Sequence, residues 1–210
     1  MSIRSVRAAA LLKLGASLLG LAAVVAVAWY VVPDHNSGST DDHDEYFLRD
    51  VATAEAMGLP VYWLGWEFTA GDLTFRGPYG AGFGNEVEGG GVDMDYLASV
   101  DGGNTLTELT TYSRDAWDLV KDREMNPRLP GVTRKTVTVG DKEGDLLYLP
   151  SYPNRPLNIL RLVLDYGDVV VVAAAAAGGP VHPGGPDYNP FINDPDLFVQ
   201  VMQGLRPYPE

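Results

Sequence analysis

Two aspartates are the first side chains in this sequence whose spacing could do chemistry. Asp93 and Asp95 alternate within residues 92–100, so a strand there places both carboxylates on one face. Paired carboxylates can act as general acid and base or bind a cation. Alternating acids are also the ordinary outcome on the solvent side of a half-buried sheet. We therefore assign them no catalytic role and predict no deep cleft around them.

Nucleophilic and phosphate-binding motifs are missing. His182 is the only histidine beyond residue 43, and no Gly-x-Ser-x-Gly elbow supplies a serine to pair with it. The glycine-rich run 77–91 contains Gly80-x-Gly82-x-Gly84, but no Gly-Lys-Ser/Thr follows. We expect a surface loop there and no catalytic residue in the chain.

Oxygen-bearing side chains gather before the C-terminus, where calcium is the ion to consider. The EF-hand order of ligands is absent, and helix capping explains Asn193 or Asp194 without a metal. The chain has no cysteine, which excludes disulfides and thiolate metal sites. We predict no metal site and no cofactor. The oxygen-bearing residues considered as calcium ligands are Asp187, Asn189, Asn193, Asp194 and Asp196.

The densest aromatic group is the best candidate for binding a ligand. Tyr62, Trp63 and Trp66 lie in or just after residues 59–65, a β-branched and aromatic run that predicts a buried strand. Alternation places Tyr62 and Trp63 on opposite faces, so one set of rings could form a platform for sugar or peptide. Packing in the core is the alternative reading of the same rings.

The elements that must position these residues are strands in hairpins with helices at both ends. This order predicts an α+β domain with an antiparallel sheet and helices packed on one face. Turn-forming residues separate the strand pairs, and the strand after Gly167-Asp168 is apolar enough to be central in the sheet. We predict helices at 45–57, 113–123 and after Asp194, strands at 59–65 and 67–75, and hairpins at 92–112, 135–149 and 158–177.

An uncharged apolar stretch precedes the domain. Residues 14–32 would span about 28 Å as a helix, close to the hydrocarbon thickness of a bilayer. Arg4, Arg7 and Lys13 precede it and acidic residues follow, so the positive-inside rule places the N-terminus in the cytoplasm. We expect an uncleaved single-pass anchor. Cleavage after Ala28 is the alternative and would give a secreted domain.

Charge is distributed unevenly along the chain. The net charge is −13, and the three basic residues before residue 33 are the only charges there, so the remainder carries 12 basic and 28 acidic residues, or −16. Such a surface repels nucleic acid and anionic lipid headgroups. We expect a well-solvated domain that does not bind nucleic acid and contacts the membrane only through the N-terminal helix.

The layout resembles a group of exported proteins. The run Leu59-Pro-Val-Tyr-Trp-Leu-Gly65, the turn Asp165-Tyr-Gly-Asp168 and the ending Gly204-Leu-Arg-Pro207 resemble membrane-anchored, actinobacterial-type domains of unknown function. The resemblance covers residues 55–207 and implies an anchor followed by a domain, with no catalytic residues to carry over.

Together these observations predict four segments: a cytoplasmic region at 1–13, a transmembrane helix or uncleaved signal anchor at 14–32, an acidic flexible linker at 33–44 and an extracytoplasmic domain at 45–210. The predicted function is a non-catalytic binding or interaction module with a partner in the envelope or outside the cell. A cell-envelope hydrolase using Asp93/Asp95 or His182 and a purely structural envelope protein are the alternatives.

Overall fold

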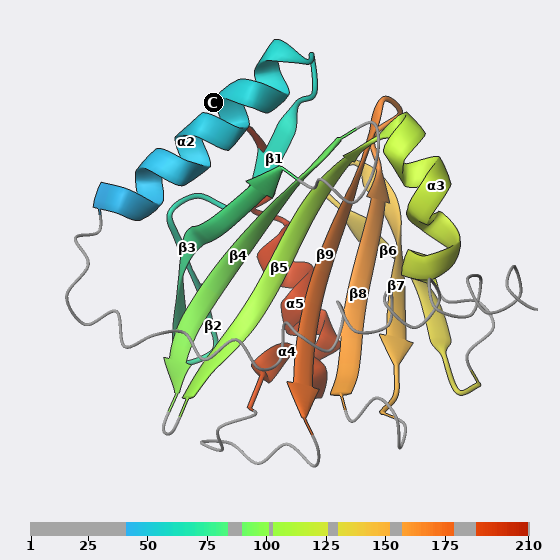
Figure 1. The fold of residues 1–210 in the computed structure, drawn as a ribbon. Helices are drawn as coiled ribbons and strands as arrows, with labels where there is room; N and C mark the ends of the chain where they lie inside the picture. The colour runs from blue at the N-terminus through green and yellow to red at the C-terminus, as the bar shows by residue number, and fades with distance from the viewer. Residues whose placement is uncertain are drawn as a thin grey trace, which may run out of the picture. The chain divides into compact units, whose positions relative to one another are not determined.

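An eight-stranded antiparallel sheet forms the body of the domain (Figure 1). The computed structural model describes residues 41–83, 90–100, 103–125, 130–151, 157–178 and 188–209. The strand order is β2-β3-β4-β5-β9-β8-β7-β6, and β1 and β10 form a separate two-stranded ribbon. The predicted α+β class with an antiparallel sheet is therefore confirmed.

The helices and strands follow one another in the order that the hairpins require. The helices are α2 (Asp41–Ala56), α3 (Arg114–Met125), α4 (Pro190–Asn193) and α5 (Pro195–Met202). The strands are β1 (Val61–Trp63), β2 (Glu67–Ala70), β3 (Leu73–Phe83), β4 (Gly91–Val100), β5 (Gly103–Ser113), β6 (Thr133–Val139), β7 (Lys142–Leu149), β8 (Leu157–Asp165), β9 (Val169–Gly178) and β10 (Arg206–Tyr208).

Three predicted hairpins are confirmed: β4–β5, β6–β7 and β8–β9. Their turns contain residues that accept the required backbone conformation. Gly140 and Gly167 have φ of +58° and +93°, which residues with a Cβ rarely adopt. Strand β9 lies between β5 and β8, which confirms its predicted central position.

Both faces of the sheet are covered by helices, so the prediction that helices pack on one face was wrong. Val169 and Val171 of β9 belong to the main core, which also contains residues of α2, α4 and α5. Val170 and Val172 point the other way and pack in a smaller cluster with Trp117 of α3. The continuous apolar run of β9 is explained by this burial on both faces.

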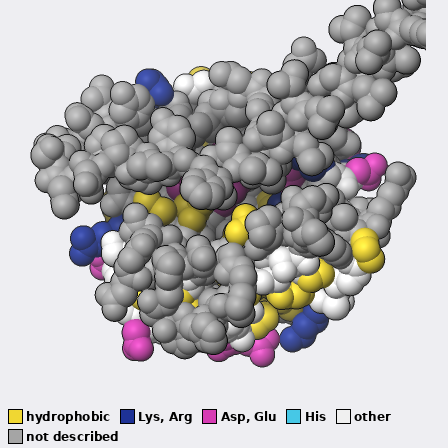
Figure 2. Space-filling view, turned by 60° about the horizontal axis from the view of Figure 1, so that its bottom comes forward, with side chains coloured by type: hydrophobic (Ala, Val, Ile, Leu, Met, Phe, Trp, Pro, Cys, Tyr) yellow, Lys and Arg dark blue, Asp and Glu magenta, His cyan; other side chains and the backbone are white. Residues whose placement is uncertain are grey.

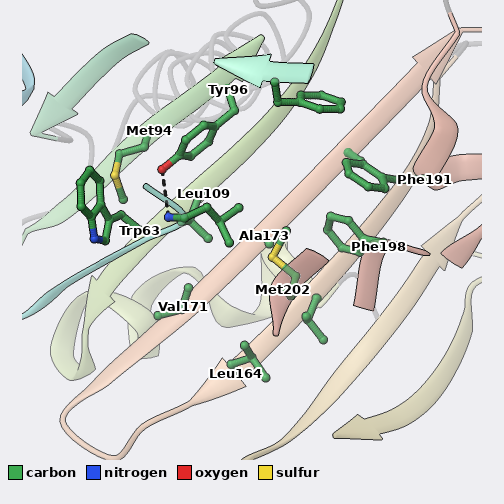
Figure 3. Close-up of a cluster of buried hydrophobic side chains, with 14 of the residues drawn as sticks. Trp63, Met94, Tyr96, Leu109, Leu164, Val171, Ala173, Phe191, Phe198 and Met202 are labelled. Atoms are coloured by element: carbon green, nitrogen blue, oxygen red, sulfur yellow. Dashed lines mark hydrogen bonds between the residues drawn. The ribbon is translucent and has the colours of Figure 1, made fainter. Parts of the chain in front are cut away.

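The helix α5 lies on the side of the main core and contacts both edge strands, β2 and β6. The sheet is thus curled around it. Phe191 of α4 and Phe198 and Met202 of α5 fill the interior, as Figure 3 shows. Asp194, one of the two capping residues that the sequence predicted, caps α5 by accepting a hydrogen bond from the backbone N–H of Leu197.

Gln203, just after α5, closes the end of the exposed edge of β6. Its side-chain N–H donates to the carbonyl of Thr138 at 2.9 Å, and its oxygen accepts from the N–H of Gly140 at 2.7 Å. This amide takes the place of a neighbouring strand at an edge that would otherwise be open to pairing.

Two segment boundaries differ from the predictions. Helix α2 begins at Asp41, so residues 41–44, which were predicted to belong to the linker, are helical. Strand β3 runs on to Phe83 through Gly80 and Gly82, which were predicted to lie in a loop. Pairing with β4, including two register shifts, holds these glycines in the sheet.

Within the described ranges, no helix has the length and apolar character needed to cross a bilayer. The predicted transmembrane helix at 14–32 lies outside those ranges.

Candidate functional site

The three aromatic residues that were predicted to bind a ligand separate in the structure. Trp63 is only 7 % exposed and packs in the core, where Figure 3 shows it beside Met94. Trp66 is 44 % exposed and meets the edge of Trp63 with ring centroids 5.3 Å apart. Tyr62 points to the opposite side of β1 and is half-buried.

The ring of Tyr62 stacks on Tyr166, which follows β8, with centroids 4.2 Å apart. These two rings line a pocket of about 390 Å³, which we call the tyrosine pocket. Its lining is Tyr62, Val139, Gly140, Asp141, Lys142, Tyr166, Gln203, Leu205 and Pro207. The hairpin β6–β7, the end of β8, strand β1 and the segment after α5 thus meet at this pocket.

Both phenols of the tyrosine pocket stay neutral across the physiological range. Burial raises the pKa of Tyr166 to about 12, and Tyr62 and the negative charge of Asp141 act in the same direction. Burial and Asp141 likewise raise the pKa of Tyr62. Neither hydroxyl has a hydrogen-bond partner among the described residues, so both can donate to and accept from a ligand.

The two charges at the tyrosine pocket balance one another. The ammonium of Lys142 lies 3.9 Å from the carboxylate of Asp141 and 5.8 Å from the ring centroid of Tyr166. Asp141 is at the rim, with its side chain 88 % exposed. The pocket therefore combines aromatic surface, two hydroxyls without a partner among the described residues, and one ion pair with no net charge.

A second group of polar residues lies on the α3 face of the sheet. Asp95 of β4 stands directly opposite Glu108 of β5, and Asp93 stands opposite Thr110. We call Asp93, Asp95 and Glu108 the carboxylate row. All three side chains are half-buried, rather than standing freely in solvent.

Two members of the carboxylate row, Asp95 and Glu108, have raised pKa values. Burial, reinforced by Glu108 and Asp93, raises the pKa of Asp95 to about 7. Burial and Asp93 raise the pKa of Glu108, opposed by Arg161 and by a hydrogen bond from the Thr110 hydroxyl at 3.4 Å. Asp95 is therefore partly protonated near neutral pH, whereas the sequence predicted an ordinary solvated carboxylate at this position.

Arg161 is held by the end of α3. Arg161 of β8 pairs with Ala174 of β9, which pairs on its other side with Glu108 of β5. The guanidinium of Arg161 is 3.1 Å from the carboxylate of Glu124. It also donates to the backbone carbonyl of Glu124. Arg161, which lowers the pKa of Glu108, is therefore already engaged with α3.

The other candidate residues have structural roles or lie outside the described ranges. Asn189 caps α4 and donates to the carbonyl of Leu106 at 3.0 Å. Asp196 pairs with Lys135 on the surface. No cluster of potential metal ligands is found in the described part of the chain. His182, Asp187 and Gly84 lie outside it.

The surface view shows how charged side chains are distributed over one face. In Figure 2, acidic and basic side chains lie scattered over the described part of this face, with no continuous basic patch there.

Three residues of the tyrosine pocket and the carboxylate row were not predicted from the sequence. Tyr166 and Lys142 are far in sequence from Tyr62, and the packing of β1 against the end of β8 brings the two tyrosines together. Glu108 reaches Asp95 through the pairing of β4 with β5. The hairpin register was the available signal for Glu108, since a turn at residues 101–104 sets Asp95 opposite it. No comparable signal pointed to Tyr166.

Comparison of the chain with protein-family models, curated proteins and solved structures finds no match. The resemblance of residues 55–207 to exported, anchored domains therefore stays a prediction.

Proposed function

We propose that the chain is a membrane-anchored, extracytoplasmic binding module without catalytic activity, and that the tyrosine pocket is its binding site. The anchor is the apolar segment 14–32, and the acidic composition of the remainder suits a solvated domain outside the membrane. The partner is a component of the envelope or the extracellular medium.

The observation that carries the proposal is the chemistry of the tyrosine pocket. Its volume of about 390 Å³ lies within the range of small-molecule sites, and the stacked rings of Tyr62 and Tyr166 supply rigid surface. Their hydroxyls are free to orient a ligand. Trp66 is 44 % exposed, but its ring packs edge-on against Phe47 and does not line the pocket.

Binding to this pocket should disappear when the rings are removed. We expect the full chain in detergent micelles to give saturation-transfer NMR signals from a mixture of small saccharides and short peptides. The double variant Tyr62→Ala/Tyr166→Ala should lose those signals, because the pocket loses its aromatic surface. Trp66→Ala is the matched control and should retain them. Signals that persist in the double variant would refute the site.

A hydrolase remains the second candidate, and one observation favours it. Asp95, with a pKa of about 7 and Glu108 opposite it, is a carboxyl that could act as a general acid near neutral pH. On this reading, the pair would cleave a glycosidic bond of the cell envelope.

The hydrolase has a clear test. If it were correct, fluorogenic glycosides or isolated cell-wall glycan would be cleaved by the wild type and not by Asp95→Asn or Glu108→Gln. We expect no cleavage above that of buffer by any of the three proteins. Turnover that depends on Asp95 would overturn the non-catalytic assignment.

A further inference from the structure

We propose that the ligand of the tyrosine pocket is an uncharged saccharide of one or two rings. This inference rests on the proposed function, because it assumes that the pocket is a binding site. It goes further by selecting one chemical class from the two that the aromatic group alone would admit.

Charge balance in the pocket argues for a neutral ligand. An anion would meet Lys142, but that ammonium is already 3.9 Å from Asp141, and the chain beyond residue 32 carries a net charge of −16. A cation would be repelled by Lys142, which also lies over the ring of Tyr166. Neither sign of charge finds an unneutralised counterpart.

Hydrogen bonding in the pocket argues against a purely apolar ligand. The hydroxyls of Tyr62 and Tyr166 have no protein partner in the described ranges, and an apolar ligand would cover them without replacing their bonds to water. A hydroxylated ligand can both donate to and accept from each phenol. The raised phenol pKa values keep both donors protonated.

The shape of the lining fits a ring with apolar C–H groups and peripheral hydroxyls. Val139, Leu205 and Pro207 supply apolar surface beside the stacked rings, whereas the side-chain amide of Gln203 is engaged with β6. About 390 Å³ has room for one or two pyranose rings. A saccharide meets all three conditions, since it is neutral, hydroxylated and apolar on its ring faces.

The test compares neutral sugars with charged sugars that have the same kind of ring. Saturation-transfer NMR on the full chain in detergent micelles uses neutral methyl glycosides and disaccharides of glucose, galactose, mannose and N-acetylglucosamine, with methyl glucuronide and methyl glucosaminide as charged counterparts. We expect binding of at least one neutral glycoside, with a weaker signal from both charged sugars.

Variants that remove one hydroxyl and keep the ring sharpen the test. Tyr62→Phe and Tyr166→Phe should each weaken binding of the neutral sugar by roughly threefold to tenfold, the effect of one hydrogen bond. Tyr148→Phe removes a hydroxyl outside the pocket and should leave the affinity unchanged.

The outcomes separate the two proposals. Peptides or charged sugars that bind through Tyr62 and Tyr166, with no neutral sugar bound, would overturn the saccharide inference and leave the binding function standing. Absence of any signal that depends on these tyrosines would overturn both.

Discussion

Asp95→Asn is expected to make the domain more stable at pH 8 than the wild type, by about 2–4 kcal/mol. The pKa of Asp95 is about 7 in the folded domain, well above the ordinary value of 3.8. The folded state therefore binds more protons than the unfolded state between these two values. Stability is full below pH 4 and falls as the pH rises toward 7, because the carboxyl of the unfolded chain ionises while the buried one keeps its proton. Above pH 7 the buried carboxyl ionises too, and the fall levels off.

Urea denaturation of residues 40–210 at several pH values measures this effect. We expect the free energy of unfolding of the wild type to drop by at least about 2–3 kcal/mol between pH 5 and pH 8. That of Asp95→Asn should drop by clearly less, because only Glu108 then keeps a raised pKa. Asp122→Asn, an exposed position on α3, is the control and should keep the wild-type slope. Equal slopes for all three proteins would show that Asp95 is an ordinary surface acid.

The second large effect concerns the interior of the curled sheet. Phe198→Ala should lower the free energy of unfolding by about 3–5 kcal/mol, because the removed ring leaves a cavity among Phe191 and the neighbouring strands. Leu119→Ala on α3, where the side chain is 70 % exposed, should change it by less than about 0.5 kcal/mol. The denaturation midpoints of the two variants give the comparison.

A loss below about 1 kcal/mol for Phe198→Ala would contradict the placement of α5 against both edge strands. That placement also positions Gln203 and Leu205 at the tyrosine pocket. The same variant therefore also tests whether α5 holds the lining of the tyrosine pocket in place.

Local sequence chemistry was enough to predict much of this fold. Each confirmed hairpin has a turn whose residues favour tight reversal, and Gly140 and Gly167 have the positive φ that such turns use. Helix α5 begins where Asp194 caps it and Pro195 follows. These are interactions between residues close in sequence, which is why the pattern exposes them.

Features set by distant contacts were not predicted. The sequence shows that Val170 and Val172 are apolar, but it does not show that α3 covers the face of the sheet on which they lie. Strand β1 pairs with β10, which is about 145 residues further along the chain. Glycine at positions 80 and 82 indicates a loop by propensity, yet pairing with β4 keeps it in the sheet.

The residues of the candidate site also fall into those that local sequence predicts and those that distant contacts determine. Tyr62 was predicted as a binding residue because local aromatic density is visible in sequence, whereas Tyr166 joins it only through the arrangement of β1 and β8. The pairing of Asp95 with Glu108 follows from the β4–β5 register. The raised pKa of Asp95 depends on burial, which its sequence neighbours do not determine.

Protease treatment of intact cells that express the full chain tests the central claim most directly, namely that the folded domain lies outside the membrane and is tethered to it. An added protease should digest the portion after residue 32 while leaving a short membrane-bound N-terminal fragment. If the domain is cut only after the cells are lysed, the domain is inside, and a module that binds an extracytoplasmic ligand is contradicted.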